Sequence, residues 1–569
     1  MSRISYLWKS PIGLFFALWA ILFVIFQSIW SDALFPVGDE INPYLWTLEF
    51  NLNRWFQEGL SRYYHSYPGW EADAHRVIRP MTHLSGWVMV QLAQIIPGTL
   101  TPYQLQLLVI TYASIAALAA VVYAIACKIY HHEWMTALLP AIVLITSGPV
   151  MAWPVLGWSL NGFDVLCALL STIALAMLAT RKFVLAALLA SIACLTKEGA
   201  LPVFAIIGCL CLLVPRYRMG GLVLLGPMIW ALIRVNAFGS LFSHAPTDGA
   251  GFEIHLRLIL GLPFSYTRNL YPKEFAPNHL LTLFMFINAS VWAALASRII
   301  AHRKALRKFQ FTYHNFFETP ARALQSFSAI LCLGLIPYLI IIESTLGYIP
   351  RYFTIALTMF LIWWLSLKQT KAMIAVMGLC LAANLYGAWF HNFHPLNNRF
   401  HQDEYQAGQN LIALLRKHAR ENPDRVIYLA NDWALVGSKG EFIAELTGVK
   451  DVFRINEIMI RDQILHQTQT ATNTVVQTED QLTFTTQLPA PYRFHFSGIK
   501  KSRLAESWSD DKKSFIRGSM TYRFPRMRDR SSMDFGDLMQ VTFPLAKAFR
   551  KDSVLIAWDF KTMRWEEFH

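Results

Sequence analysis

Long apolar segments alternate with short polar turns over the first 390 residues of the chain, and this alternation stops near residue 391. Apolar runs of about twenty residues are long enough to cross the hydrocarbon core of a bilayer as helices. Helical structure is required there, because backbone groups in lipid must be hydrogen-bonded within their own segment. We predict eleven spans, at 12–30, 104–127, 135–153, 164–180, 183–196, 200–214, 220–238, 279–297, 326–343, 353–367 and 372–390.

The segment from Met81 to Ile96 decides the topology of everything after it. It is only moderately apolar, since it carries His83, Gln91 and Gln94, and it is short for a span. If it crossed the membrane, the later basic turns would all lie outside, contrary to the preference of Lys and Arg for the cytoplasmic side. We therefore interpret it as a juxtamembrane helix, within residues 81–97, that does not cross.

This topology places a defined set of polar residues on the outer side of the membrane. The two long polar loops, 31–80 and 239–278, both fall there. The same side receives charged or polar residues that lie at the ends of separate spans, namely Asp164, Lys197, Glu198, Arg234, Arg351 and Tyr352. The set follows from the charge of the turns alone.

The composition changes from His391 onward, where charged residues return and long apolar runs stop. Residues 403–420 have the leucine spacing of an amphipathic helix, and 441–446 reads as a second helix. Segments 425–430, 481–487 and 554–558 read as strands. We therefore expect residues 1–390 to form a transmembrane module and residues 391–569 to form a small extracytoplasmic α/β domain.

Composition supports a membrane protein and argues against a nucleic-acid partner. The 569 residues are 54% hydrophobic and only 15% charged, against about a quarter charged in ordinary soluble proteins, and the mean hydropathy is +0.35. The net charge of +13 comes from short turns and the C-terminal part, which favours anionic membrane lipids as partners. All seven cysteines lie in apolar segments, so the sequence predicts neither a disulfide framework nor structural zinc.

Asp39 and Glu40 form the first acidic pair after the first apolar segment. Charge at a bilayer edge is costly unless it is solvated or paired, so the pair is a candidate site, although it could also simply end a helix. Acids and cations that converge at one membrane face suit the transfer of a sugar from a lipid phosphate to a hydroxyl. That reaction needs a base for the acceptor proton and cations for the departing phosphate.

Short stretches of the chain resemble motifs of the GT-C superfamily of polyprenyl-phosphate-sugar-dependent glycosyltransferases. Besides Asp39-Glu40, the similar stretches are Ile78-Arg79-Pro80-Met81-Thr82-His83-Leu84, Asn161-Gly162-Phe163-Asp164, Leu195-Thr196-Lys197-Glu198 and Pro350-Arg351-Tyr352. They resemble, in order and side, motifs of protein O-mannosyltransferases and of the lipid A aminoarabinose transferase. The chain departs from the family pattern by a single Pro after Arg79 and by the lack of an Asp-x-Asp motif at Asp164.

The resemblance implies a polytopic GT-C-like fold and a role for each matched residue. Asp39 would take the acceptor proton, with Glu40 as the alternative base or as a partner of an arginine. The residues implied in substrate binding are Arg79, Asp164, Lys197, Glu198, Arg351 and Tyr352. Alternatives stay open for several of them: a loop salt bridge for Asp39, snorkelling to headgroups for the arginines, and a mutual ion pair for Lys197 and Glu198.

We therefore expect an inverting glycosyltransferase of the bacterial inner membrane, with its active site outside. Its expected partners are a polyprenyl-phosphate-linked sugar donor, an acceptor hydroxyl on a glycan, lipid or protein, and membrane lipids. Obligatory metal binding is not implied, because Asp164 lacks a second carboxylate, and Mg or Mn stays an open alternative. A transporter or lipid flippase, and a non-catalytic envelope scaffold, are the competing hypotheses.

Overall fold

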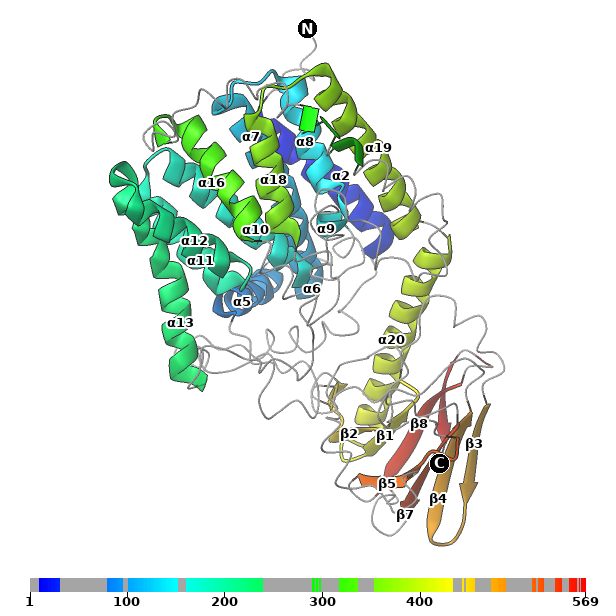
Figure 1. Cartoon of the computed structure of the whole chain (residues 1–569). Helices are drawn as coiled ribbons and strands as arrows, with labels where there is room; N and C mark the ends of the chain where they lie inside the picture. The colour runs from blue at the N-terminus through cyan, green and yellow to red at the C-terminus, as the bar shows by residue number, and fades with distance from the viewer. Residues whose placement is uncertain are drawn as a thin grey trace. The chain divides into compact units, whose positions relative to one another are not determined.

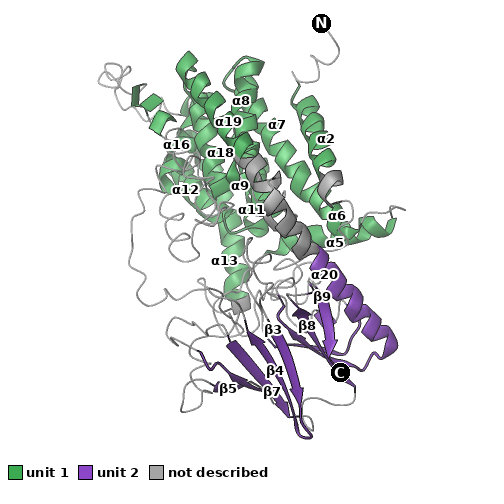
Figure 2. Cartoon of the chain, turned by 90° about the vertical axis from the view of Figure 1, so that its right-hand side faces the viewer, with its two compact units in different colours: residues 1–35, 50–62, 78–394 green, residues 36–49, 63–77, 395–569 purple. Residues whose placement is uncertain are grey.

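The structure is a computed structural model of the whole chain, and it separates into two compact units (Figure 2). It describes residues 10–30, 79–95, 101–151, 160–238, 317–335, 353–393, 395–432, 447–455, 472–487, 520–526, 538–544 and 552–559, with short pieces at 289–291, 293–294, 296–297, 443–444, 514–517, 562 and 564–568. The described residues up to 393 belong to the first unit and those from 395 onward to the second. Each unit is described by itself.

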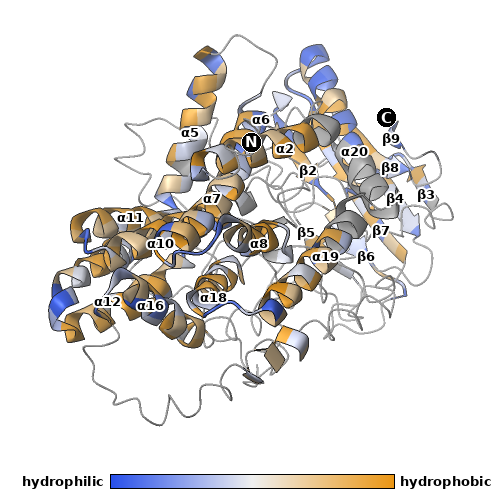
Figure 3. Cartoon of the chain, turned by 90° about the horizontal axis from the view of Figure 1, so that it is seen from above, coloured by the Kyte–Doolittle hydropathy of each residue, from blue (hydrophilic) through white to orange (hydrophobic). Residues whose placement is uncertain are grey.

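The first unit is built from helices (Figure 1). In chain order they are α2 (Pro11–Trp30), α5 (Pro80–Ile95), α6 (Pro102–Leu105), the π-helical turn η3 (Gln106–Tyr112), α7 (Ala113–Lys128), α8 (Trp134–Ile145), α9 (Gly148–Met151), α10 (Leu160–Ala179), α11 (Phe183–Thr196), α12 (Ala200–Leu213), the 3₁₀ segment η5 (Pro215–Leu224), α13 (Leu225–Phe238), α16 (Pro320–Gly334), α18 (Thr354–Ser366) and α19 (Lys371–Phe393). Their residues are predominantly apolar, as Figure 3 shows for α10, α12 and α18.

Within the described part of the chain, three helices are long and apolar enough to cross a membrane, namely Pro102–Lys128, Gly162–Ala179 and Pro215–Asn236. They correspond to the spans predicted at 104–127, 164–180 and 220–238. Six more predicted spans coincide with shorter apolar helices, which begin at Pro11, Trp134, Phe183, Ala200, Thr354 and Lys371. A membrane protein with apolar helices is therefore supported, whereas the number of eleven spans is not confirmed, and the span at 279–297 lies largely outside the described residues.

Small residues let the helices around α11 approach closely. Ala186, Ala190 and Ala193 of α11 are fully buried, and a Cβ placed on Gly226 of α13 would lie 2.9 Å from the carbonyl oxygen of Ala190. Small side chains at helix crossings bring backbones together, which is the usual source of packing energy between apolar helices. This packing fixes the carboxyl end of α11, where the candidate site begins.

The second unit begins with α20 (Pro395–Glu421) and contains two sheets. The strands are β1 (Val426–Ala430), β2 (Asp451–Arg454), β3 (Thr472–Gln477), β4 (Gln481–Gln487), β5 (Ser514–Arg517), β6 (Met520–Arg523), β7 (Leu538–Pro544), β8 (Ser553–Asp559) and β9 (Arg564–Phe568). One sheet has the order β2-β1-β8-β9, with β1 parallel to β2 and β8, and the other is the antiparallel sheet β3-β4-β7-β6-β5.

The local predictions that fall on described residues of the second unit agree with the structure. The strands predicted at 425–430, 481–487 and 554–558 are β1, β4 and β8, and the helix predicted at 403–420 is α20, which is longer at its amino end. The sheet-containing C-terminal region is thereby confirmed. The helix predicted at 441–446 lies mostly outside the described residues.

Candidate functional site

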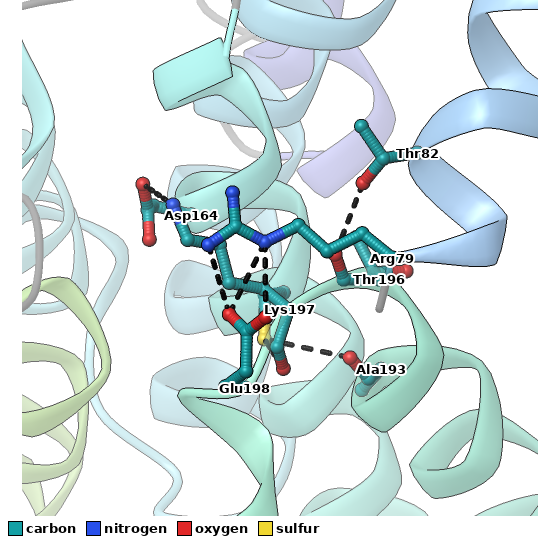
Figure 4. Close-up of polar contacts among 8 residues, drawn as sticks. Arg79, Thr82, Asp164, Ala193, Thr196, Lys197 and Glu198 are labelled. Atoms are coloured by element: carbon teal, nitrogen blue, oxygen red, sulfur yellow. Dashed lines mark hydrogen bonds and ion pairs between the residues drawn. The ribbon is translucent and has the colours of Figure 1, made fainter. Parts of the chain in front are cut away.

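Lys197 and Asp164 form a buried ion pair between neighbouring helices of the first unit (Figure 4). The Lys197 Nζ lies 2.5 Å from the Asp164 Oδ2, and the two side chains are only 4% and 7% exposed. Lys197 directly follows α11 in an extended conformation, with φ of −156°, whereas Asp164 lies near the amino end of α10. A cation just past the carboxyl end of a helix is favoured by the unpaired carbonyls there.

Glu198 forms the second ion pair of the site, with Arg79 (Figure 4). The Arg79 Nη2 donates to the Glu198 Oε2 at 3.0 Å, and the Arg79 Nε lies 3.1 Å and 3.2 Å from the two carboxylate oxygens. This is a fork contact that holds the plane of the guanidinium as well as its charge. Arg79 directly precedes α5, whose first residue is Pro80, so the helix begins beside the site.

The pKa of Glu198 reflects both its burial and its partners. Burial alone would raise the pKa of this carboxyl, but the charge of Arg79, its hydrogen bonds and the charge of Lys197 together lower it below the ordinary value. Glu198 is therefore a carboxylate at neutral pH, and the Arg79 pair is formed under those conditions. The pair weakens only when the solution is acidic enough to protonate the carboxyl.

Two uncharged side chains hold the backbone of the same turn. The Thr82 hydroxyl, on α5, donates to the carbonyl of Thr196 at 3.0 Å. The Cys167 Sγ, on α10, lies 3.7 Å from the carbonyl oxygens of both Ala193 and Lys197. Sequence reasoning did not give these two residues a role, although each stands three positions after a charged residue of the site, which places it on the same helix face.

Four of the eight predicted site residues are thus brought together: Arg79, Asp164, Lys197 and Glu198. The ion pairs join Lys197 and Glu198 to other segments, so the interpretation of a mutual pair at the end of the span is wrong. The other four, Asp39, Glu40, Arg351 and Tyr352, lie outside the described residues. No cluster of three or more His, Cys, Asp or Glu side chains that could hold a metal ion occurs among the residues that the structure describes.

A second polar cluster lies in the C-terminal unit, at the carboxyl end of β1. Asp432 is fully buried and pairs with Arg454 at the end of β2. In open parallel sheets, ligands bind at the carboxyl ends of the strands, at the point where the strand order reverses. In the order β2-β1-β8-β9 this point lies between β1 and β8. Asn473 of β3 occupies that position, because it accepts a bond from Asn431 and donates one to the carbonyl of Trp558, both at 2.9 Å. We therefore assign this cluster to joining the two sheets.

The site in the first unit consists of two charge-balanced ion pairs. It combines a fork donor, an ammonium group and two carboxylates that orient them, at one end of a set of apolar helices. Such cations can hold a phosphate group at a lipid-water boundary. No protein-family model matches this chain, and no curated protein is significantly similar to it.

Proposed function

We propose that this protein is a GT-C-type glycosyltransferase, which moves a sugar from a polyprenyl-phosphate-linked donor to an acceptor hydroxyl at the outer face of the cytoplasmic membrane. The observation that carries the proposal is the meeting of Arg79, Asp164 and the Lys197-Glu198 dipeptide through two ion pairs. These residues come from separate segments, and each belongs to a stretch that resembles a motif of that superfamily. Residues that bind one substrate must lie close together in space, and the two ion pairs meet this requirement.

In the proposed reaction, Asp39 accepts the proton of the acceptor hydroxyl while the hydroxyl oxygen attacks the anomeric carbon of the sugar. The bond between that carbon and the phosphate oxygen breaks, and its electron pair leaves with the polyprenyl phosphate. A single displacement of this kind inverts the anomeric centre. Glu40 is the alternative base or pairs with an arginine.

Cations stabilise the negative charge that develops on the departing phosphate. In this proposal Arg79 and Arg351 bind the phosphate, and Tyr352 is a further substrate-binding residue. Glu198 holds the guanidinium plane of Arg79 by the fork contact, and Asp164 holds the ammonium of Lys197. The carboxylates thereby keep both cations oriented before the donor arrives, so less ordering is needed during the reaction.

The distribution of charge over the helix ends supports the proposed orientation. The amino end of α10 lies beside Lys197 and beside Thr111 of η3, so the carboxyl ends of α7 and α10 lie at the opposite end of the unit. The described turns at that opposite end carry Lys128, Arg181, Lys182, Arg216, Arg218, Arg322, Lys368 and Lys371, against the acids Glu133 and Glu318. Lys and Arg are enriched on the cytoplasmic side, which supports an outer position for the ion-pair site.

Exposed apolar side chains support a lipid environment for the same unit. Val184 of α11, Leu213 of α12 and Leu232 of α13 are each about 70% exposed in the isolated chain, at 76%, 70% and 68%. Apolar surface of this kind is stable in hydrocarbon and costly in water. A polyprenyl tail is chemically suited to the same surroundings, which is consistent with a lipid-linked donor.

The proposal is tested with the purified protein in lipid nanodiscs and a panel of radiolabelled donors: polyprenyl-phosphate-linked mannose, glucose and aminoarabinose. Release of free polyprenyl phosphate is measured together with transfer of label to an added envelope extract. Asp39→Asn should lower transfer by about 10²- to 10⁴-fold, because a general base contributes that much. Asp32→Asn, an acid of the same predicted loop, serves as the matched control and should retain activity.

The same experiment separates the competing functions. A transporter or flippase would move the lipid-linked sugar between leaflets without releasing polyprenyl phosphate, and a scaffold would do neither. Wild-type transfer in the Asp39→Asn variant would remove Asp39 from the mechanism. Absence of release with every donor of the panel would count against the glycosyltransferase assignment itself.

A further inference from the structure

The turn between α11 and α12 is held on one side by two residues of the α5 segment. Arg79 forms the fork contact with Glu198, and Thr82, three residues later, donates its hydroxyl to the carbonyl of Thr196 at 3.0 Å. Thr82 is only 4% exposed. One side chain of the segment thus contacts a charged residue of the turn, and the other contacts the backbone directly before it (Figure 4).

The α10 segment repeats this arrangement on its own side of the turn. Asp164 pairs with Lys197, and Cys167, three residues later, places its Sγ 3.7 Å from the carbonyl oxygens of Ala193 and Lys197. Asp164 and Cys167 are both buried. Two separate segments therefore each supply one charged contact to the Lys197-Glu198 dipeptide and one uncharged contact to the backbone at the end of α11.

The backbone contacts matter because α11 ends at this point. The last carbonyls of a helix have no partner within the helix, and a buried carbonyl without a donor is unfavourable. Lys197 leaves the helical conformation and becomes extended. The directions of the Lys197 and Glu198 side chains therefore depend on the contacts that fix the backbone of this turn. The Thr82 hydroxyl supplies a donor to the Thr196 carbonyl, whereas the two carbonyls that the Cys167 Sγ approaches already accept from the amides of Lys197 and Ala200, so its thiol adds a weaker second contact there.

We propose that Thr82 and Cys167 are positioning residues, which hold the 197–198 turn so that its two charged side chains face Asp164 and Arg79. The role in turnover rests on the proposed glycosyltransferase function, whereas the role in holding the turn does not. Thr82 carries the larger effect, because a hydroxyl is a stronger hydrogen-bond donor than a thiol. Neither residue contacts the reacting atoms, and both act through Arg79 and Lys197.

The first test compares Thr82→Val, which removes the hydroxyl at nearly equal size, with Thr82→Ser, which retains it. With the labelled polyprenyl-phosphate sugar that wild type turns over, Thr82→Val should raise the donor KM by roughly tenfold and change kcat less, since small displacements of a binding group weaken its contact. Thr82→Ser should have a donor KM within about threefold of the wild-type value. Thr172→Val is the matched control, because Thr172 is equally buried and bonds the Ala168 carbonyl at 2.7 Å within α10.

A double-mutant cycle asks whether Thr82 acts through Glu198. If it does, the effects of Thr82→Val and Glu198→Gln on donor KM should be strongly non-additive, while Thr172→Val and Glu198→Gln should combine additively. Additive effects for Thr82 would overturn the proposal. A merely structural role for Thr82 would lower stability without this coupling.

Hydrogen–deuterium exchange provides a readout that needs no activity. The amides of Ala200 and Leu201 bond back to the carbonyls of Lys197 and Glu198 at 3.3 Å and 3.0 Å, so peptides covering 196–202 report on the turn. Exchange there should rise in Thr82→Val and, less strongly, in Cys167→Ala, but not in Thr172→Val. Unchanged exchange in both variants would overturn the positioning role, whereas faster exchange in a chain that turns over no donor would support it and count against the proposed function alone.

Discussion

The Lys197 ammonium lies 2.5 Å from the Asp164 carboxylate, with both side chains almost completely buried. Removing one partner of such a pair leaves the other charge buried without its counterion, which typically costs about 3–5 kcal/mol. Lys197→Gln and Asp164→Asn should therefore each lower the midpoint of thermal unfolding clearly. The double variant should lose less than the sum of the two, because two amides can bond each other.

The exposed pair between Arg322 and Glu318 is the control for this prediction. Their side chains are 54% and 56% exposed, and the Arg322 Nη1 lies 2.8 Å from the Glu318 Oε2, four positions away on the chain. A solvated pair of this kind contributes only about 0.3–0.5 kcal/mol. Equal effects from Glu318→Gln and Asp164→Asn on the midpoint would contradict the prediction.

The charge of the turns predicted that Arg79, Asp164 and Lys197 lie at the same end of the helices, and the two ion pairs bring these residues together with Glu198. The sequence was not sufficient to predict the partners. Lys197 and Glu198 are adjacent in the chain and could have paired with each other, and only the packing of α5, α10 and α11 determines that they bond Asp164 and Arg79 instead. Roles for Asp39 and Arg351 remain predictions from the sequence.

Gly162 is required by the close approach of α10 to η3. A Cβ at this position would lie 2.2 Å from the Thr111 Oγ1 and 2.9 Å from the Thr111 Cα, so the backbone would have to move. Gly162→Ala should therefore destabilise the protein by about 1–3 kcal/mol, as overpacking does. Because Asp164 follows two residues later, the same variant should also weaken its pair with Lys197, which thermal unfolding of Gly162→Ala in the Lys197→Gln background would measure.

Gly378 of α19 is the matched control for Gly162. A Cβ at Gly378 would meet no atom within 4 Å, so Gly378→Ala should be neutral or stabilise the helix by up to about 1 kcal/mol. A Gly162→Ala variant that unfolds at the same temperature as Gly378→Ala would show that the two helices do not approach as closely as described.

The sheets of the C-terminal unit show where local sequence patterns stop being informative. Alternating and buried apolar runs correctly predicted β1, β4 and β8. These runs did not predict how the strands pair. β1 lies parallel to β8, with Val426 opposite Ser553, and contacts between residues so distant in the chain leave no local signal in the sequence. The antiparallel sheet was not predicted either. Its β4–β7 pairing, with Gln481 opposite Pro544, is again between distant residues, whereas β3 and β4 form a local hairpin that the sequence analysis missed.

The orientation of the first unit predicts which positions an impermeant reagent reaches. Lys182 lies in the turn between α10 and α11 at the basic end, and Asn236 lies near the end of α13, and both are exposed. In right-side-out membrane vesicles, Asn236→Cys should react with a membrane-impermeant maleimide, whereas Lys182→Cys should react only after permeabilisation, because in the proposed orientation the basic end faces the cytoplasm.

Cys209 is the one exposed native thiol among the described residues, so these variants are made together with Cys209→Ser. The Cys209→Ser chain without an added cysteine gives the background of labelling. The reverse pattern, with Lys182→Cys labelled in intact vesicles, would invert the topology and place the ion-pair site inside.

His418 predicts how the stability of the C-terminal unit depends on pH. The Arg425 Nη1 donates to the His418 Nδ1 at 2.5 Å, so this nitrogen carries no proton, because a guanidinium cannot accept a hydrogen bond. Burial lowers the pKa of His418 from its ordinary value of 6.5, and the charges of Arg425 and Lys417 lower it further, while Glu567 and Glu421 oppose the shift.

A histidine whose pKa is lower in the folded state contributes stability that is complete above its unfolded pKa, about 6.5. That contribution decreases as the pH falls from about 6.5 toward the folded pKa, because the unfolded chain then binds the proton more readily. His418→Gln keeps an acceptor for Arg425 and a donor toward Glu567 but does not titrate. The thermal midpoint of wild type should therefore fall more steeply than that of His418→Gln between about pH 7 and 5, and parallel curves would show that protonation of His418 is not linked to unfolding.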